Sequence, residues 1–337
     1  MTDNASPASE QPPFRIGTRR SNLAMVQAEG IRDSLQKICP GRKFEIEAMR
    51  TLGDKDQNTA LYNFNAKSLW TAELEDKLNA GELDVVVHCL KDMPTALPDT
   101  CELGAIPLRD DPRDALIVKA GLRYTSLSTL PDGALVGTSS VRRSAQLSRL
   151  YPHLRFANLR GNVETRLAKV DDPAGEYTCM IMSACGLERV GLKDRITQYL
   201  GSKDGGIFHA VGQGALGLEI RKGDQKTLEL LAQLSDRKST LACLAERALL
   251  RRLEGGCSVP IGVETEWVDH ESQQGFLRIR AIVVSLDGTR SVEDSVDAKV
   301  DTTNAAESVG RDLASRLLKA GADRLLGEIT ADRPSKN

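Results

Sequence analysis

Residues 84–88 carry the pattern that does most to limit the fold, an Asp-Val-Val-Val-His run. A continuous apolar run with polar ends is typical of a strand buried on both faces, as in a sheet with helices on either side. The chain begins with a strand pattern at residues 14–18, a helix start at Ser21 and an alternating strand pattern at residues 44–48. This strand, helix, strand order predicts an α/β layer.

A second α/β unit is predicted over residues 114–211, because strand and helix patterns alternate there again. Its predicted elements are strands at 115–118, 135–138, 156–158 and 179–182, and helices at 141–150 and 163–170. Residues 217–220 then return to a strand pattern. We expect that strand to rejoin the first sheet, which makes the first domain discontinuous.

The C-terminal part of the chain has a different pattern. Ser239 is expected to cap a long helix that ends at Leu253. Strands are predicted around 261–267 and 277–286, with a hairpin turn at Asp287-Gly288. A final helix is expected to bury apolar residues spaced three and four apart, namely Ala306, Val309, Leu313, Leu317 and Ala320.

The sequence therefore predicts two α/β domains with a cleft between them, and a small α+β third domain. The predicted boundaries are a disordered start at 1–13, domain 1 at 14–113 and 213–236, domain 2 at 114–212, and domain 3 at 239–329. A chain of 337 residues is long enough for two or three separate cores.

Composition limits the class of protein. With 40% hydrophobic and 27% charged residues, the chain is typical of a soluble globular protein, and it has no run of 18 apolar residues that could span a membrane. Residues 1–13 lack the features of a signal peptide. Seven cysteines without a Cys-x-x-Cys pair favour reduced thiols, and four histidines form no metal-type cluster. We expect a cytoplasmic monomer that holds no metal.

Positive charge is concentrated in one stretch of a nearly neutral chain. The net charge is -2, yet residues 133–163 contain no Asp or Glu. The arginines within or just after that stretch are Arg142, Arg143, Arg149, Arg155, Arg160 and Arg166. Because nucleic acid usually requires a basic domain, this pattern indicates a small polyanionic ligand held in a cleft.

Arginine and hydroxyl side chains gather where predicted strands end and helices begin. Free backbone N–H groups and the helix dipole favour an anion there, and a guanidinium can bind a carboxylate through two hydrogen bonds. Ser140 could be a simple helix cap, but the adjacent Arg142 and Arg143 would repel each other without an anion. The ends of the strands should meet at one cleft. The side chains expected there are Arg19, Ser21, Ser139, Ser140, Arg142, Arg143, Arg160 and Arg166.

Lys91-Asp92 comes directly after the buried run at 84–88. The pair could be a surface ion pair of little consequence. Its position at the end of a buried strand instead places it at the same edge as the arginines. A carboxylate in a cationic cleft can stabilise positive charge on a substrate and can transfer protons.

Two glycine-rich segments need separate interpretations. Residues 212–217 match G-x-G-x-x-G, but a strand pattern follows where a dinucleotide site needs a helix, so we favour a hinge or an interdomain crossing. Gly255-Gly256-Cys257 follows the long helix. Cys257 could be an ordinary loop thiol, and the two glycines would allow close approach to a ligand.

Taken together, these segments resemble the hydroxymethylbilane synthase family, also called porphobilinogen deaminase, over about residues 14–326. The motifs occur in the order of that family: 18–24, 88–94, 111–115, 137–143, 160–162, 186–189, 211–215 and 253–260. The resemblance implies two periplasmic-binding-protein-like α/β domains with a third, α+β domain. It also implies a covalent dipyrromethane cofactor, porphobilinogen as the substrate, and a linear tetrapyrrole, hydroxymethylbilane, as the product.

The resemblance further implies the roles of individual residues. Cys257 would hold the cofactor through a thioether, and Asp92 would stabilise the cation that forms when ammonia leaves porphobilinogen. The residues at cofactor- and substrate-binding positions are Arg19, Ser21, Gln27, Lys91, Ser139, Ser140, Arg142, Arg143, Arg160, Gly161, Arg166, Arg189 and Gln213. Cys89 stands where the family usually has Ser, Cys185 where Ala is common, and His209 where Pro is common.

Two other classes of function remain open from the residues alone. Two α/β domains joined by crossings also describe bilobed solute-binding proteins, so the chain could be an anion receptor. That interpretation gives no role to Cys257 or to Lys91-Asp92. A thiol enzyme that forms acyl intermediates on Cys257 is the other alternative, although no His is near it in the sequence.

Overall fold

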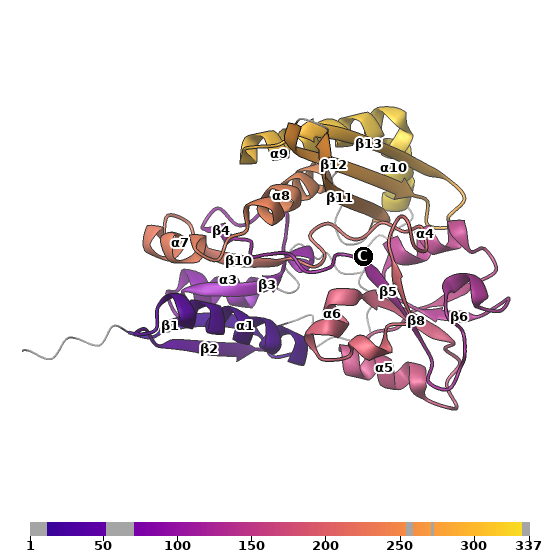
Figure 1. Ribbon diagram of the computed structural model, residues 1–337, viewed down its shortest axis with the longest axis horizontal. Helices are drawn as coiled ribbons and strands as arrows, with labels where there is room; N and C mark the ends of the chain where they lie inside the picture. The colour runs from indigo at the N-terminus through magenta and orange to yellow at the C-terminus, as the bar shows by residue number, and fades with distance from the viewer. Residues whose placement is uncertain (1–11, 52–70, 254–258, 271–272, 332–337) are drawn as a thin grey trace, which may run out of the picture.

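The computed structural model describes residues 12–51, 71–253, 259–270 and 273–331, and its strands form three sheets. In Figure 1 the first sheet lies at the lower left, the second at the lower right and the third at the top. The predicted disordered start falls almost wholly outside the described residues, and so do Gly255, Gly256 and Cys257.

The first sheet has the strand order β2-β1-β3-β10-β4. β1 is parallel to β2 and β3, whereas β10 is antiparallel to β3 and β4. The strands are β1 (Phe14–Arg19), β2 (Phe44–Met49), β3 (Val85–Cys89), β4 (Cys101–Ala105) and β10 (Leu216–Arg221). The helices that pack on it are α1 (Asn22–Ile38), α3 (Ala72–Asn79) and α7 (Gln225–Ala232). The prediction that residues 217–220 rejoin the first sheet is confirmed.

Strand β3 is buried on both faces, as its Val-Val-Val run predicts. Val85 and Val87 pack in the core that contains Leu35 of α1. Val86 points to the other face, where it packs with Leu74 of α3. Because helices cover both faces, the end of β3 is the part of this strand from which polar side chains can reach a ligand.

The second sheet has the order β7-β6-β8-β5-β9. β6 is parallel to β7 and β8, and β5 is antiparallel to β8 and β9. The strands are β5 (Asp114–Val118), β6 (Leu135–Gly137), β7 (Arg155–Ala157), β8 (Cys179–Ser183) and β9 (Gln198–Leu200). The helices are α4 (Val141–Leu150), α5 (Val163–Asp171) and α6 (Ala184–Arg189). Every strand and helix predicted within this unit is present.

The two sheets have the same plan. In each sheet three neighbouring strands are parallel, and the strand beside them is antiparallel and is reached by a crossing from the other sheet. The first crossing joins β4 to β5, and the second joins β9 to β10. The carboxyl ends of β1, β3, β6 and β8 face the region between the sheets, where open α/β sheets bind ligands. One-turn helices η2 (Leu90–Asp92), η3 (Leu127–Thr129) and η4 (Lys193–Arg195) lie in the connections.

The third sheet is antiparallel, with the order β11-β12-β13, and helices α8 and α9 pack on one face of it. Its elements are α8 (Arg237–Arg252), β11 (Ile261–His270), β12 (Gln273–Val284), β13 (Ser291–Lys299), α9 (Thr303–Leu317), the π-helical turn η5 (Leu318–Ala322) and α10 (Asp323–Ala331). The predicted turn at Asp287-Gly288 connects β12 to β13.

Two details of the third unit were predicted wrongly. Helix α8 begins at Arg237, and its N-cap is Asp236, whose carboxylate accepts a hydrogen bond from the Ser239 backbone N–H at 2.7 Å. Ser239 therefore lies inside the first turn. Ala320 is exposed, because Gly321 with φ 106° breaks the helical path after α9 and redirects the chain into α10.

Candidate functional site

A cavity of about 300 Å³ lies between the first and second sheets and also touches the third unit. The residues come from the ends of β1, β3 and β8, from the starts of α1, α4 and α5, from α6, and from the second crossing. The predicted site residues that line it are Arg19, Ser21, Gln27, Lys91, Asp92, Ser139, Ser140, Arg142, Arg143, Gly161, Arg166, Arg189 and Gln213. The prediction of one cleft at the strand ends is confirmed.

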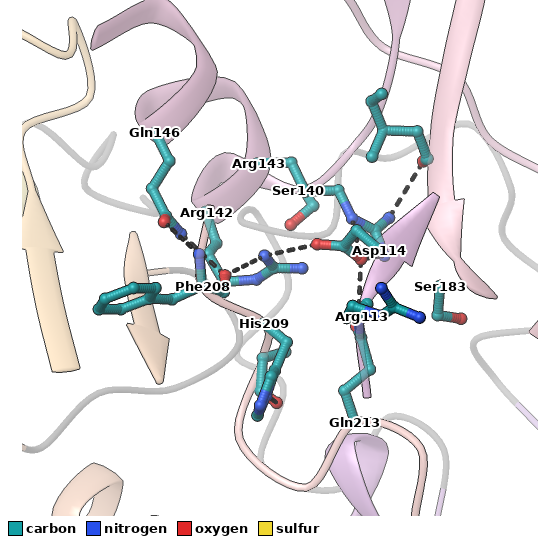
Figure 2. Close-up of polar contacts among 12 residues, drawn as sticks. Arg113, Asp114, Ser140, Arg142, Arg143, Gln146, Ser183, Phe208, His209 and Gln213 are labelled. Atoms are coloured by element: carbon teal, nitrogen blue, oxygen red, sulfur yellow. Dashed lines mark hydrogen bonds and ion pairs between the residues drawn. The ribbon is translucent and has the colours of Figure 1, made fainter. Parts of the chain in front are cut away.

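The start of α4 contributes two buried arginines that share one carboxylate (Figure 2). Arg142 Nη1 donates to Asp114 Oδ2 at 2.8 Å, and Arg143 Nη2 donates to Asp114 Oδ1 at 2.7 Å. Burial alone would raise the pKa of Asp114, but the two guanidiniums outweigh burial and hold that pKa far below its usual value. Asp114 is therefore ionised at neutral pH.

This carboxylate changes the argument for an anion at α4. Residues 133–163 contain no acidic residue, but Asp114 of β5, which precedes them in the chain, contacts Arg142 and Arg143 in the fold. The repulsion expected between Arg142 and Arg143 is thus relieved within the protein. The two arginines together keep a single net positive charge toward the cavity, rather than two.

The serines at the helix starts do not act as side-chain caps. Ser21 and Ser140 occupy the N-cap positions of α1 and α4, and neither side chain makes a capping hydrogen bond. Both residues line the cavity, together with Ser139. Their hydroxyls are therefore placed to bind a ligand, which the simple-cap interpretation of Ser140 does not explain.

Lys91 and Asp92 lie in η2, directly after β3, and both side chains are half-buried at the cavity. Lys91 Nζ donates to Ser183 Oγ at 3.4 Å, which joins the end of β3 to the end of β8. Burial, followed by Arg143 and Arg160, lowers the pKa of Arg166 to about 10, whereas Asp92 acts to raise it. Asp92 is thus close to the arginine cluster, as its position after the buried run predicts.

Gln27 and Cys89, which both line the cavity, contact each other. The Gln27 Nε2 amide donates to Cys89 Sγ at 3.2 Å. Burial raises the pKa of the Cys89 thiol, and the charge of Asp92 raises it further, so the thiol stays protonated. Gln27, which also lines the cavity, therefore holds the Cys89 thiol in place.

Residues 212–215 form the second crossing, and no helix follows them. β10 begins at Leu216, so the arrangement needed for a dinucleotide is absent. Gly214 has φ 87°, and a Cβ there would lie 2.5 Å from the Asp110 carbonyl oxygen of the first crossing. The crossing interpretation is confirmed. Arg189 ties the crossings to α6, because its Nε donates to Asp110 Oδ2 at 2.8 Å and its Nη2 to Gly214 O at 2.7 Å.

Some predicted residues do not line the cavity. Arg160 is buried next to it, whereas Arg149 and Arg155 are exposed elsewhere. Cys257 lies outside the described residues, although Leu250 and Val259, which precede and follow the undescribed segment, both line the cavity.

Sequence reasoning missed several residues that the fold brings to the site. Ser183, Cys185, Asn162 and Glu164 line the cavity, and Asp114 lies directly behind the arginines. The sequence signals for Asp114 were its place in the 111–115 motif and its position as an acidic residue at the start of a fully apolar strand.

Within the described ranges, no cluster of three or more His, Cys, Asp or Glu side chains could hold a metal ion. None of the helices in that part of the chain has the length and apolar character needed to cross a membrane.

Likeness to solved structures is weak. The VFT2 domain of BvgS from Bordetella pertussis aligns with 66% of this chain and 87% of its own, at 13% identity and a TM-score of 0.40. The periplasmic aliphatic sulphonate binding protein SsuA from Escherichia coli aligns with 72% of this chain and 71% of its own, at 14% identity and a TM-score of 0.35. Likeness at this level does not extend to function.

Sequence comparisons are much stronger. The family model "Porphobilinogen deaminase, dipyromethane cofactor binding domain" matches residues 14–229, and the model of the C-terminal domain matches residues 240–319. The porphobilinogen deaminase of Yarrowia lipolytica is 51% identical over 95% of this chain and 94% of its own length. That of Saccharomyces cerevisiae is 47% identical over 95% and 98%. The chain belongs to the porphobilinogen deaminase family.

Proposed function

We propose that the chain is a hydroxymethylbilane synthase, a transferase that condenses four porphobilinogen molecules with loss of ammonia and releases the linear tetrapyrrole. The observation that carries the proposal is the cavity itself, in which a half-buried carboxylate, Asp92, is surrounded by arginines at the carboxyl ends of two sheets. Porphobilinogen carries an acetate and a propionate, so a growing chain of pyrroles accumulates carboxylates that such a cavity can bind.

The residues at the cavity fit a dipyrromethane cofactor. Among the described residues, six cationic side chains line it against two carboxylates, Asp92 and Glu164. The Arg142 Nε atom is buried and has no hydrogen-bond partner among the described residues. A buried donor without an acceptor is unfavourable, and a ligand carboxylate would satisfy it. The cationic members of the set are Arg19, Lys91, Arg142, Arg143, Arg166 and Arg189.

The proposed roles of the protein groups follow from their positions. The arginines bind the acetate and propionate groups and so orient each pyrrole, which lowers the entropic cost of reaction. Asp92 stabilises the positive charge that develops on porphobilinogen as the C–N bond to the leaving ammonia breaks. It is also placed to accept a pyrrole N–H hydrogen bond. When bound, dipyrromethane supplies the pyrrole α-carbon that is nucleophilic toward this electrophile.

We propose Cys257 as the attachment residue, through a thioether. The support is its place in the chain, because the residues before and after the segment, Leu250 and Val259, line the cavity.

We also propose that the three sheets correspond to three domains, with boundaries at 14–113 with 213–236, 114–212, and 239–329. The support is that each sheet has its own core and that two crossings connect the first two. We propose a cytoplasmic monomer. In favour of a reducing compartment, the six cysteines in the described ranges are free thiols.

An intact-mass measurement tests the function. The purified chain should exceed its sequence mass by two linked pyrroles, the excess should map to the peptide with Cys257, and Cys257→Ala should lose both the excess and the conversion of porphobilinogen to hydroxymethylbilane and ammonia. An apo mass together with full turnover would refute the tether. A chain that binds porphobilinogen without releasing ammonia would instead be an anion receptor.

A further inference from the structure

Asp114 is a buried carboxylate that none of the proposed chemical steps uses. It stands at the start of β5 with no solvent exposure. Its Oδ1 accepts hydrogen bonds from Arg143 Nη2 at 2.7 Å, Arg143 Nε at 3.0 Å and Gln213 Nε2 at 2.9 Å, and its Oδ2 accepts from Arg142 Nη1 at 2.8 Å. Figure 2 shows these side chains converging on Asp114 from α4 and from the second crossing.

Arg142, Arg143 and Asp114 together carry one net positive charge. Arg142 and Arg143 are 4% and 7% exposed, so neither guanidinium is well solvated. Two such cations without an anion would be strongly destabilising, because a buried charge needs a partner. Asp114 supplies one negative charge, and the Gln213 amide is neutral. The group as a whole therefore retains one positive charge at the cavity wall.

The same contacts fix the direction of each guanidinium. Arg142 Nη1 also donates to the Phe208 carbonyl oxygen at 2.6 Å, and Arg143 Nη1 donates to the Ile181 carbonyl oxygen at 3.2 Å. Each arginine is thus held by Asp114 and by one backbone carbonyl on a different segment. None of these contacts uses Arg142 Nε, which is buried without a hydrogen-bond partner among the described residues.

We propose that Asp114 is a positioning residue for ligand binding, a built-in carboxylate that orients Arg142 and Arg143 and cancels one of their charges, so that the pair accepts a single ligand carboxylate. The identity of that ligand rests on the proposed function, whereas the charge count does not. Removing the Asp114 charge should therefore create a site for one more carboxylate from solution.

The test uses the full chain carrying Cys257→Ser, which leaves the cavity open to a small anion whether or not a cofactor normally occupies it. Thermal midpoints are measured against succinate, with sodium chloride at equal ionic strength as the salt control. In Asp114→Asn, succinate should raise the midpoint several-fold more than in the parent, because one of its carboxylates replaces the missing charge. Sodium chloride should affect both chains equally.

Asp111→Asn is the matched control. Asp111 also pairs with an arginine, since Arg113 Nη2 lies 2.7 Å from its Oδ2, but neither residue lines the cavity. Its response to succinate should equal that of the parent. If Asp114→Asn responds to succinate no more than Asp111→Asn does, Asp114 is structural only and the proposal is overturned.

A second variant keeps the test decisive if Asp114→Asn fails to fold. Asp114→Asn combined with Arg142→Gln restores the net charge of the parent, so the double variant should be more stable than the single one. A double variant no more stable than Asp114→Asn would overturn the charge argument. These readouts need no turnover, so a chain with Cys257 intact that fails to convert porphobilinogen would refute the proposed function and leave this inference standing.

Discussion

At the scale of the residue, two aspartates at one cavity have opposite environments. Asp114 is fully buried and paired with the protein's own arginines, whereas Asp92 is half-buried and faces the cavity. The sequence predicted Asp92 because a buried strand leads directly to it. It could not predict Asp114 as the partner of Arg142 and Arg143, which are 28 and 29 residues away along the chain. Such pairs depend on how the elements are packed, and the local pattern does not contain that information.

Asp92→Asn should fold normally and turn over porphobilinogen far more slowly. The amide keeps the shape of the side chain but cannot stabilise a cation, and loss of one such group typically lowers kcat by roughly 10²–10³-fold. Thermal midpoint and steady-state kinetics measure the two effects. Asp99→Asn is the control, because Asp99 is exposed on the loop that follows and should change neither quantity. Near-normal turnover in Asp92→Asn would contradict the role assigned to the carboxylate.

At the scale of the element, boundaries were predictable where a local signal marks them. Helix α4 has the predicted bounds, because two serines directly precede it and mark its start. Helix α8 starts earlier than predicted, because its N-cap is Asp236 and not Ser239. The bend after α9 follows from a positive φ at Gly321, and a periodic apolar pattern running through a glycine does not reveal it.

Gly310 of α9 lies where α9 packs closely against α8, so the stability of the chain should be sensitive to a side chain at this position. A Cβ there would lie 2.0 Å from the Ala245 carbonyl oxygen, which is backbone and cannot rotate away. Gly310→Ala should therefore destabilise the chain by about 1–3 kcal/mol, measured as a lower urea midpoint. Gly327→Ala on α10 is the control, since no atom lies within 4 Å of that Cβ position, and it should stabilise the helix by about 0.5–1 kcal/mol. Equal urea midpoints for the two variants would show that α9 can move away from α8 with no loss of stability.

At the scale of the whole molecule, the two crossings and the third unit meet at Glu246. This fully buried residue of α8 accepts hydrogen bonds from Arg109 of the first crossing at 2.6 Å, from the Gly212 backbone N–H of the second crossing at 2.8 Å, and from Thr265 Oγ1 of β11 at 2.6 Å. One carboxylate thus connects both crossings to the third unit. No sequence pattern identifies such a junction, because its members come from four separate segments.

His209 lies beside this junction and should make the stability of the whole chain depend on pH. Burial is the main cause that lowers its pKa below 6.5, and Arg109 and, more weakly, Arg142 lower it further, although Glu246 and the Ala210 carbonyl act in the opposite direction. The folded chain therefore holds His209 neutral, whereas the unfolded chain takes up a proton as the pH falls below about 6.5. Stability is fully present above that pH and is lost as the pH falls toward the lower, folded pKa.

The expected slope is about 1.4 kcal/mol per pH unit at most within that window, from the one extra proton bound by the unfolded chain. Urea midpoints are measured at pH 7.0 and 5.5, values chosen as roughly either side of the onset. The difference between the two midpoints should be larger for the parent than for His209→Asn, which carries no titrating group at that position. Burial is the main cause that raises the pKa of Glu75, which also makes stability depend on pH, so the informative quantity is the difference between variant and parent. His153→Gln, at a half-exposed position, controls for the loss of a histidine and should keep the parental slope. An unchanged slope in His209→Asn would show that the junction tolerates the proton, and that the pH response arises elsewhere.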